Sequence, residues 1–372
     1  MLTCYSRAIA VRRIVMVLGV GSLMLSGLAA VSPPAAAKEK YTVDPVTGTK
    51  YKPDPEMKEL LTTLAALGGK PIETLTPTEA RSQPTMADAV NALLKKRGED
   101  TDPSKLASGV TTIDATIPLQ DETQLTATLY TPTGPGPFPA VVYFHGGGWV
   151  MGSSQGYDAS ARTLAKGAQA VVISVDYRLA PEYKFPTAWD DALAAYKWAT
   201  TNVGRWRGDP RRLALAGESS GGNLAISTAI SAVAAGVTRP KAVIAIYPVT
   251  QTGSTTESYV DSANARPLNK AMIGWFLDKT LNSAADKMDP RLDIIHAKLS
   301  LLPPVTIINA QIDPLRSDGA MFEEALKQVK VKVTRKEYEG VTHQFFGAAA
   351  VLSAAKNAQA FAAEQLKDAF KE

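Results

Sequence analysis

The chain reads Gly217-Glu218-Ser219-Ser220-Gly221-Gly222 directly after the apolar run 213–216 and directly before a stretch typical of a helix. This is the G-x-S-x-G pattern in a strand-turn-helix setting. A serine at the tip of such a turn sits in a strained backbone that exposes its Oγ at the end of the strand. The flanking glycines matter because a Cβ there would collide with the neighbouring strand and helix. Of the two adjacent serines, the spacing from Gly217 and Gly221 selects Ser219 as the nucleophile.

A serine nucleophile needs a base, and the chain has three histidines that could supply it. His343 follows a strand-like run at 331–338, where a loop can place an imidazole over Ser219. His145 precedes a glycine triplet and is expected to brace that loop by hydrogen bonds. His296 lies in a polar stretch, where a surface or cap position is expected. We therefore expect His343 to be the base.

A third group must orient the imidazole, and Asp313 is the residue expected to do so. It follows the apolar run 305–310, and Pro314 fixes the turn after it. The alternatives are that Asp313 only caps a helix or makes a turn. Asp318 is the nearest competitor, but it lies inside a predicted helix. The chain order serine, aspartate, histidine is that of α/β hydrolases.

A tetrahedral intermediate of acyl transfer needs preorganised donors for its oxyanion. Gly146-Gly147-Gly148 follows the apolar run 140–144, and a glycine triplet allows two backbone N–H groups to point into one site. The N–H of Ser220, the residue after the nucleophile, is the third expected donor. A tight turn or a phosphate loop is the alternative for the triplet. No Gly-Lys-Ser follows and no G-x-G-x-x-G opens a βαβ unit, which argues against a nucleotide site.

Near-continuous apolar runs alternate with helix-like segments from about residue 140 onwards. Strands that are apolar on both faces are typical of a parallel sheet covered by helices. Two alternating runs, at 112–117 and 125–130, predict a half-buried antiparallel pair before it. The expected fold is α/β, with a mostly parallel central sheet, helices on both faces and a mainly helical cap. The expected parallel strands are 140–144, 170–175, 213–216, 242–247 and 305–310, and the expected helices are 157–166, 187–202, 222–235 and 317–329.

An N-terminal helical cap is predicted for residues 38–110. This region contains helix-like pieces at 55–67 and 86–96, each followed by glycine, and no β-rich run. It looks like a lid and not like an independent catalytic domain.

Residues 111–372 are the expected catalytic domain. Within it, about 253–302 interrupts the alternation after a strand's carboxyl end, so this insertion is expected to lie over the site as a second part of the cap. Its Trp275 and Phe276 are expected to pack the helix, with lining of an acyl pocket as the alternative.

The first 37 residues carry Arg7, Arg12 and Arg13, no acid, and an apolar run that ends in Ala35-Ala36-Ala37. This predicts a signal peptide over 1–37 and an exported protein, periplasmic or secreted, with an uncleaved membrane anchor as the alternative. Without these three arginines the net charge of +4 falls to about +1. We therefore expect no nucleic-acid partner and, after cleavage, no stable membrane partner.

The single cysteine, Cys4, lies within the predicted signal peptide. The mature chain would then have no thiol, which excludes disulfides, thiolate catalysis and cysteine-ligated metal sites. Its histidines are widely spaced and make no metal-ligand cluster, so neither a metal nor another cofactor is expected.

Five motifs occur in a fixed order: His145-Gly146-Gly147-Gly148-Trp149, Tyr177-Arg178-Leu179-Ala180-Pro181-Glu182, the serine motif, Asp313-Pro314-Leu315 and the late His343. Together they resemble the hormone-sensitive lipase family of α/β hydrolases, the bacterial family IV esterases. The resemblance covers the chain from about residue 55 to the C-terminus. It implies Ser219, Asp313 and His343 as a triad, with Gly147, Gly148 and Ser220 as oxyanion donors. It also implies that the segment 177–182 braces the active-site loops.

Three positions depart from the family's usual pattern. Glu218-Ser219-Ser220-Gly221 stands where Asp-Ser-Ala-Gly is usual, and Arg316-Ser317-Asp318 where Arg-Asp-Glu is typical. Gln344-Phe345-Phe346 follows the histidine in place of Gly-Phe. These departures bear on substrate preference more than on catalysis.

The leading hypothesis is a serine carboxylic-ester hydrolase that cleaves short- to medium-chain acyl esters through an acyl-serine intermediate. A deacetylase, amidase or lactonase with the same triad is the alternative. A ligand-binding module on an inactive hydrolase scaffold is disfavoured, because such relatives generally lose a triad member. The expected partner is a small-molecule ester, and a homo-oligomer is left open.

Overall fold

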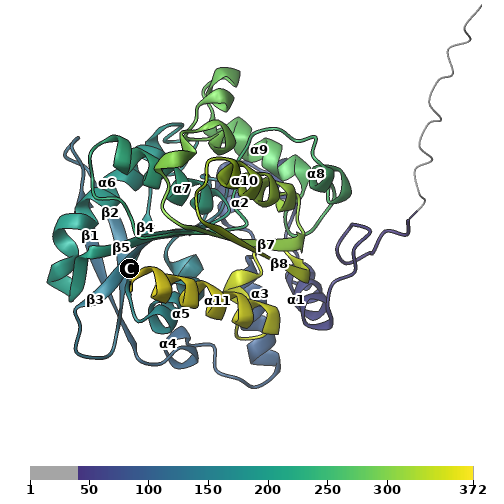
Figure 1. Ribbon diagram of the computed structural model, residues 1–372. Helices are drawn as coiled ribbons and strands as arrows, with labels where there is room; N and C mark the ends of the chain where they lie inside the picture. The colour runs from purple at the N-terminus through teal and green to yellow at the C-terminus, as the bar shows by residue number, and fades with distance from the viewer. Residues whose placement is uncertain (1–40, 372) are drawn as a thin grey trace, which may run out of the picture. The chain divides into compact units, whose positions relative to one another are not determined.

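The computed structural model describes residues 41–371 of the chain (Figure 1). Contacts divide the chain into Met1–Tyr41 and a second unit, Thr42–Glu372, which is described below. The predicted signal peptide lies outside the described residues, and it stays a prediction together with the export that it implies. Between residues 41 and 371, no helix is long and apolar enough to cross a membrane.

An eight-stranded sheet forms the centre of this unit, in the order β1-β2-β4-β3-β5-β6-β7-β8. Strand β2 is antiparallel to both β1 and β4, and every other neighbouring pair is parallel. The fold class is the predicted one. The strands are β1 Val110–Pro118, β2 Gln124–Pro132, β3 Phe138–Phe144, β4 Val171–Asp176, β5 Gly208–Glu218, β6 Val243–Ile246, β7 Val305–Ile312 and β8 Val333–Thr342.

Burial follows the position of each strand in the sheet. The central strands β3 and β6 are buried at every residue, as expected for strands covered on both faces. The prediction that both antiparallel strands are half-buried is wrong for β1, in which only Val110 and Ile117 are buried. It lies at the edge of the sheet, so its alternating sequence does not reflect a covered face; β2, one strand further in, does alternate.

Helices cover both faces of the sheet (Figure 1). Helices α5 and α11 lie on one face, where their apolar sides share a core with α1 (Pro55–Ala66) and α3 (Met86–Lys96). Helices α6, α7 and α10 lie on the other face and share a second core with the insertion helix α9 (Lys270–Thr280). The bounds are α5 Asp158–Ala168, α6 Thr187–Asn202, α7 Ser220–Ala234, α10 Arg316–Gln328 and α11 Ser353–Ala369.

Among the described residues, the two segments predicted to form the cap contain helices and no strand apart from Val110, the first residue of β1. Asp54 caps the first helix, and Thr76 and Thr85 each form a capping box at the next two. The segments touch each other, because Asn269 donates to Glu73 and the Trp275 indole N–H donates to the Leu75 carbonyl. The helices are α1 Pro55–Ala66, α2 Pro77–Arg81, α3 Met86–Lys96 and α4 Pro103–Leu106, then α8 Glu257–Asp261 and α9 Lys270–Thr280. The division into cap and catalytic domain stays a prediction.

A glycine substitution tests how tightly α7 approaches β3. A Cβ added at Gly221 would lie 2.1 Å from the Phe144 carbonyl oxygen, and backbone atoms on both sides cannot move aside. We expect Gly221→Ala to lower the free energy of unfolding by about 3 kcal/mol in urea denaturation. The matched control is Gly274→Ala on the exposed side of α9, where a Cβ meets nothing within 4 Å. Gly274→Ala should raise the free energy of unfolding slightly, because alanine favours a helix more than glycine does. Equal changes in the free energy of unfolding for the two variants would contradict the close approach of α7 to β3.

Candidate active site

Ser219 forms the turn between β5 and α7. Its backbone has φ 58° and ψ −118°, a conformation that non-glycine residues rarely adopt. Its N–H donates to the Ile246 carbonyl at 2.8 Å, which ties the turn to the neighbouring strand β6. A Cβ at Gly217 would lie 2.1 Å from the Gly221 carbonyl oxygen, so the turn closes only with glycine there. The strand, turn and helix therefore hold the Ser219 hydroxyl at the carboxyl end of β5.

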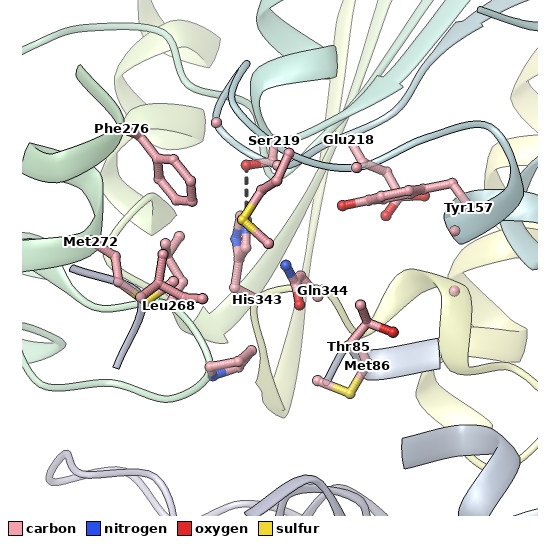
Figure 2. Close-up of a pocket in the computed structure, with 18 of the residues that line it drawn as sticks. Thr85, Met86, Tyr157, Glu218, Ser219, Leu268, Met272, Phe276, His343 and Gln344 are labelled. Carbon is pink, nitrogen blue, oxygen red and sulfur yellow. Dashed lines mark hydrogen bonds between the residues drawn. The ribbon is translucent and has the colours of Figure 1, made fainter. Parts of the chain in front are cut away.

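His343 and Asp313 meet Ser219 in one hydrogen-bonded chain. The His343 Nε2 lies 2.9 Å from the Ser219 Oγ, and its Nδ1 lies 2.7 Å from the Asp313 Oδ2 (Figure 2). Asp313 follows β7 and His343 follows β8, so adjacent strands deliver the two side chains to the edge where Ser219 ends β5. All three residues are buried. A carboxylate on Nδ1–H leaves Nε2 free to accept the serine proton.

The expected oxyanion donors surround the same serine. Gly147 and Gly148 have φ values of 111° and 61°, both in the region that favours glycine, and both line the cavity that contains Ser219. Ser220 is the first residue of α7, where a backbone N–H has no partner within the helix. A Cβ at Gly148 would lie 2.2 Å from the Phe276 ring, so this glycine also makes room for a residue of α9.

The other two histidines occupy separate environments. His145 is buried, stacks on Tyr177 with ring centroids 4.3 Å apart, and has its Nδ1 2.8 Å from the Gly146 carbonyl oxygen. Burial lowers its pKa, which favours the neutral imidazole. These contacts brace the glycine loop. His296 is exposed, and its Nδ1 lies 2.7 Å from an Asp293 oxygen.

Asp318, the competitor for the role of Asp313, is buried away from the imidazole. Its carboxylate accepts from the Thr250 N–H at 3.1 Å and from the Gln251 Nε2 at 3.0 Å. Burial, together with the nearby charge of Asp313, raises its pKa to about 7. Because Asp318 lies inside a helix, the sequence already favoured Asp313 over it as the residue that orients the base. The structure adds that it holds the Gln251 side chain at the cavity wall.

Arg81 is a site residue that sequence reasoning missed. It lies in α2, lines the cavity, and donates to the carbonyl oxygens of Val150 and Ala180, each at 2.8 Å. Its guanidinium also forms a bidentate ion pair with the Glu182 carboxylate, with N–O distances of 2.6 and 2.8 Å. Arg81 therefore joins the N-terminal helices to the glycine loop and to the segment 177–182. Only Glu182 carried a sequence signal.

Glu218 contacts two tyrosines beside the site, a role that the serine motif alone does not indicate. Its carboxylate is buried and accepts hydrogen bonds from the hydroxyls of Tyr143, at 2.5 Å, and Tyr247. Burial raises the pKa of Glu218. The Tyr247 ring in turn lies 4.5 Å from the His343 ring, centroid to centroid. The residue before the nucleophile is thus linked through a tyrosine to the face of the imidazole.

The Ser219 hydroxyl faces a cavity of about 380 Å³. Its lining is mostly apolar and includes Leu268, Met272 and Phe276, which lie to one side of the Ser219–His343 pair in Figure 2. Phe276 takes both roles that the sequence left open, because it packs in the core and also lines the cavity. Trp275 is not part of the lining, and its indole N–H donates to the Leu75 carbonyl. Among residues 41–371, no group of three or more histidine, cysteine or acidic side chains could hold a metal ion.

Comparisons with known proteins place this geometry in a family. A family model described as an alpha/beta hydrolase fold matches residues 141–347. The carboxylesterase NlhH of Mycobacterium tuberculosis is 39% identical over 226 residues, which are 59% of this chain and 70% of that protein. The chain belongs to the hormone-sensitive lipase family of α/β hydrolases.

Two further relatives agree with this family. The ethyl acetate hydrolase of Pseudomonas putida is 32% identical over 259 residues, 68% of this hydrolase and 81% of that protein. A solved esterase of Pyrobaculum calidifontis superposes with a TM-score of 0.74 at 34% identity. The match covers 82% of this chain and 97% of the esterase chain. The hydrolase is therefore an enzyme of the carboxylesterase class.

Replacing Arg81 tests whether it positions the glycine loop. Arg81→Ala removes the hydrogen bonds to Val150 and Ala180 next to that loop, so we expect kcat/KM for p-nitrophenyl butyrate to fall about tenfold. The control is Arg97→Ala, which removes an exposed ion pair with Glu59 in the same N-terminal segment. The control should change kcat/KM less than about twofold. Similar losses in both variants would show that Arg81 acts only on general stability.

The raised pKa of Asp318 predicts a pH-dependent stability. Its pKa is about 7 in the fold against an ordinary 3.8, so the folded protein binds this proton more tightly than the unfolded chain. The resulting contribution to stability is present at low pH and is lost as pH rises toward 7. Asp318→Asn cannot ionise, so its stability relative to the wild type should increase by about 2 kcal/mol between pH 5 and pH 8.

Urea denaturation of wild type and variant at both pH values measures this difference, and the other titrating groups cancel. The exposed Asp278 pairs with Lys279 and its pKa is lowered, so the control Asp278→Asn should show no such change. If the free energies of unfolding of wild type and Asp318→Asn differed by the same amount at pH 5 and pH 8, ionisation of the buried Asp318 carboxyl would be ruled out.

Proposed function

We propose that this enzyme hydrolyses short- to medium-chain carboxylic esters through an acyl-serine intermediate, with Ser219, His343 and Asp313 as its triad. The observation that carries the proposal is the unbroken hydrogen-bonded chain from Asp313 through His343 to Ser219, which opens into an apolar cavity. A nucleophile, a base and a group that orients the base are what this chemistry requires.

In the proposed reaction, the Ser219 Oγ attacks the ester carbonyl while His343 Nε2 accepts its proton. The backbone N–H groups of Gly147, Gly148 and Ser220 stabilise the oxyanion that forms. His343 then donates the proton to the departing alcohol, and Asp313 stabilises the imidazolium throughout. Water, activated by the same imidazole, hydrolyses the acyl-serine and restores the enzyme.

The dimensions and lining of the cavity support the substrate class. A volume of about 380 Å³ lies at the lower end of the range for small-molecule sites, which fits a short or medium acyl chain. Apolar side chains of α9 on one wall can contact hydrocarbon and exclude water. The name of the Pseudomonas putida relative, ethyl acetate hydrolase, refers to a short ester.

The test is the activity of serine variants on p-nitrophenyl esters from acetate to laurate. Ser219→Ala removes the nucleophile, so we expect kcat to fall at least about a thousandfold on every ester. Ser220→Ala keeps the backbone N–H and should lose less than about tenfold, which decides between the adjacent serines. Highest kcat/KM on the shorter chains would support the acyl preference.

Three results would count against the proposal. Activity that survives Ser219→Ala would exclude the mechanism. A wild type inactive on these esters but active on an amide, a lactone or an acetylated glycan would favour the alternative bonds. A wild type that binds esters and turns none over would favour the inactive scaffold.

A further inference from the structure

Gln344 occupies an unfavourable backbone conformation beside the base. It follows His343 directly and has φ 66°, in the left-handed region where a side chain is disfavoured and glycine is not. Gln169 and Lys330 share this conformation, but both are exposed near the ends of surface helices. Gln344 instead lines the cavity. Strained residues persist where the surrounding structure holds them, and they gather at functional sites.

The Gln344 amide is free to bind a ligand. Within residues 41–371 it has no hydrogen-bond partner, although it is half-buried. The Trp149 indole N–H and the Ser160 hydroxyl also lack a partner within this range, but both atoms are buried in the wall. Four other polar side chains at the cavity wall are already engaged. Arg81 binds Glu182, Thr85 binds Asp88, Gln251 binds Asp318, and Glu218 binds two tyrosines.

The two halves of the cavity, one on each side of the Ser219–His343 pair, have different linings. In Figure 2, Gln344 lies on one side of this pair, toward Thr85, Met86 and Tyr157. The apolar side chains Leu268, Met272 and Phe276 lie on the other side. An ester bound with its carbonyl at Ser219 would therefore place one arm against hydrocarbon and bring the other arm to an amide.

We propose that Gln344 is a specificity-determining residue that binds a neutral hydrogen-bonding group, such as a hydroxyl or a carbonyl, on one arm of the ester substrate. This inference rests on the proposed ester hydrolysis and narrows it to esters with one hydrocarbon arm and one neutral polar arm. The amide both donates and accepts, so it matches a hydroxyl or a carbonyl group equally well.

A charged substituent fits this half of the cavity less well. The charge of Arg81 is paired with Glu182, and Glu218 is buried under its two tyrosine hydroxyls. Neither offers an unpaired opposite charge to a substrate. A carboxylate or ammonium on the substrate would lose its hydration without compensation, whereas a neutral group loses far less and gains the Gln344 hydrogen bond.

The test compares esters that differ only by a hydroxyl in place of a methyl group. One pair places the change on the acyl arm, ethyl 3-hydroxybutyrate against ethyl 3-methylbutyrate. The other places it on the alcohol arm, 2-hydroxyethyl butyrate against propyl butyrate. In one of the pairs, Gln344→Gly and Gln344→Leu should each lower the hydroxyl-to-methyl ratio of kcat/KM about three- to tenfold, the range for one neutral hydrogen bond.

The matched control is Gln169→Gly, the same replacement in the same backbone conformation on the surface. It should leave both ratios unchanged. Gln344→Gly should keep or raise Tm, because glycine relieves the left-handed strain; Gln344→Leu keeps the strain and removes only the amide.

The outcomes separate this inference from the function on which it rests. Ratios that stay constant in both Gln344 variants, while the wild type hydrolyses the esters, overturn the role of Gln344 and leave ester hydrolysis in place. A wild type that hydrolyses none of the four esters overturns both proposals. Should Gln344→Gly fail to fold, the ratio in Gln344→Leu decides the question.

Discussion

The closeness of three backbones around Ser219 is the constraint on which the site depends. The turn after β5 leaves no room for a Cβ at Gly217 or at Gly221, where the nearest carbonyl oxygens would lie 2.1 Å away. The Ser219 N–H is fixed to Ile246 at the end of β6. Strands β3, β5 and β6 and the helix α7 therefore meet at a single point. The parallel register that aligns these strands also sets the direction of the nucleophile, so sheet and site cannot vary independently.

Three carboxylates are buried near this point, and each is stabilised in a different way. Asp313 contacts the His343 imidazole, Glu218 accepts from two tyrosine hydroxyls, and Asp318 accepts from a backbone N–H and an amide. Burial raises the pKa of Glu218 and of Asp318. Only Asp313 has a partner whose positive charge develops during the proposed reaction. The other two hold Tyr247 and Gln251 in place, and through them the face of the imidazole and the cavity wall.

Features carried by local pattern could be predicted from the sequence. The helix at Thr187–Asn202 has the predicted bounds, and strands β3, β5 and β7 each contain the apolar run that indicated them but extend beyond it. Motifs at strand ends are predictable because parallel strands bring their carboxyl ends to one edge. The residues at three such ends, Ser219, Asp313 and His343, lie within hydrogen-bonding distance for that reason.

Features that depend on tertiary contacts could not be predicted in this way. Arg81 reaches Glu182 across about a hundred residues of sequence, and nothing in a short helix marks that contact. The exposure of β1 follows from its place at the edge of the sheet, which an alternating run does not reveal. Phe276 lies against Gly148 only because the insertion folds back over the glycine loop.

The contact between Phe276 and Gly148 has a consequence for how substrate preference and rate are linked. The aromatic ring forms part of the cavity wall, while the glycine belongs to the loop expected to stabilise the oxyanion. Because the two pack without a gap, a change of size at Phe276 would also alter the support of the loop. On the opposite side of the cavity, the Gln344 amide has no hydrogen-bond partner within residues 41–371, so its replacement removes no hydrogen bond from the protein. We therefore expect a change at Gln344 to alter the preference between substrates with less effect on rate than a change at Phe276.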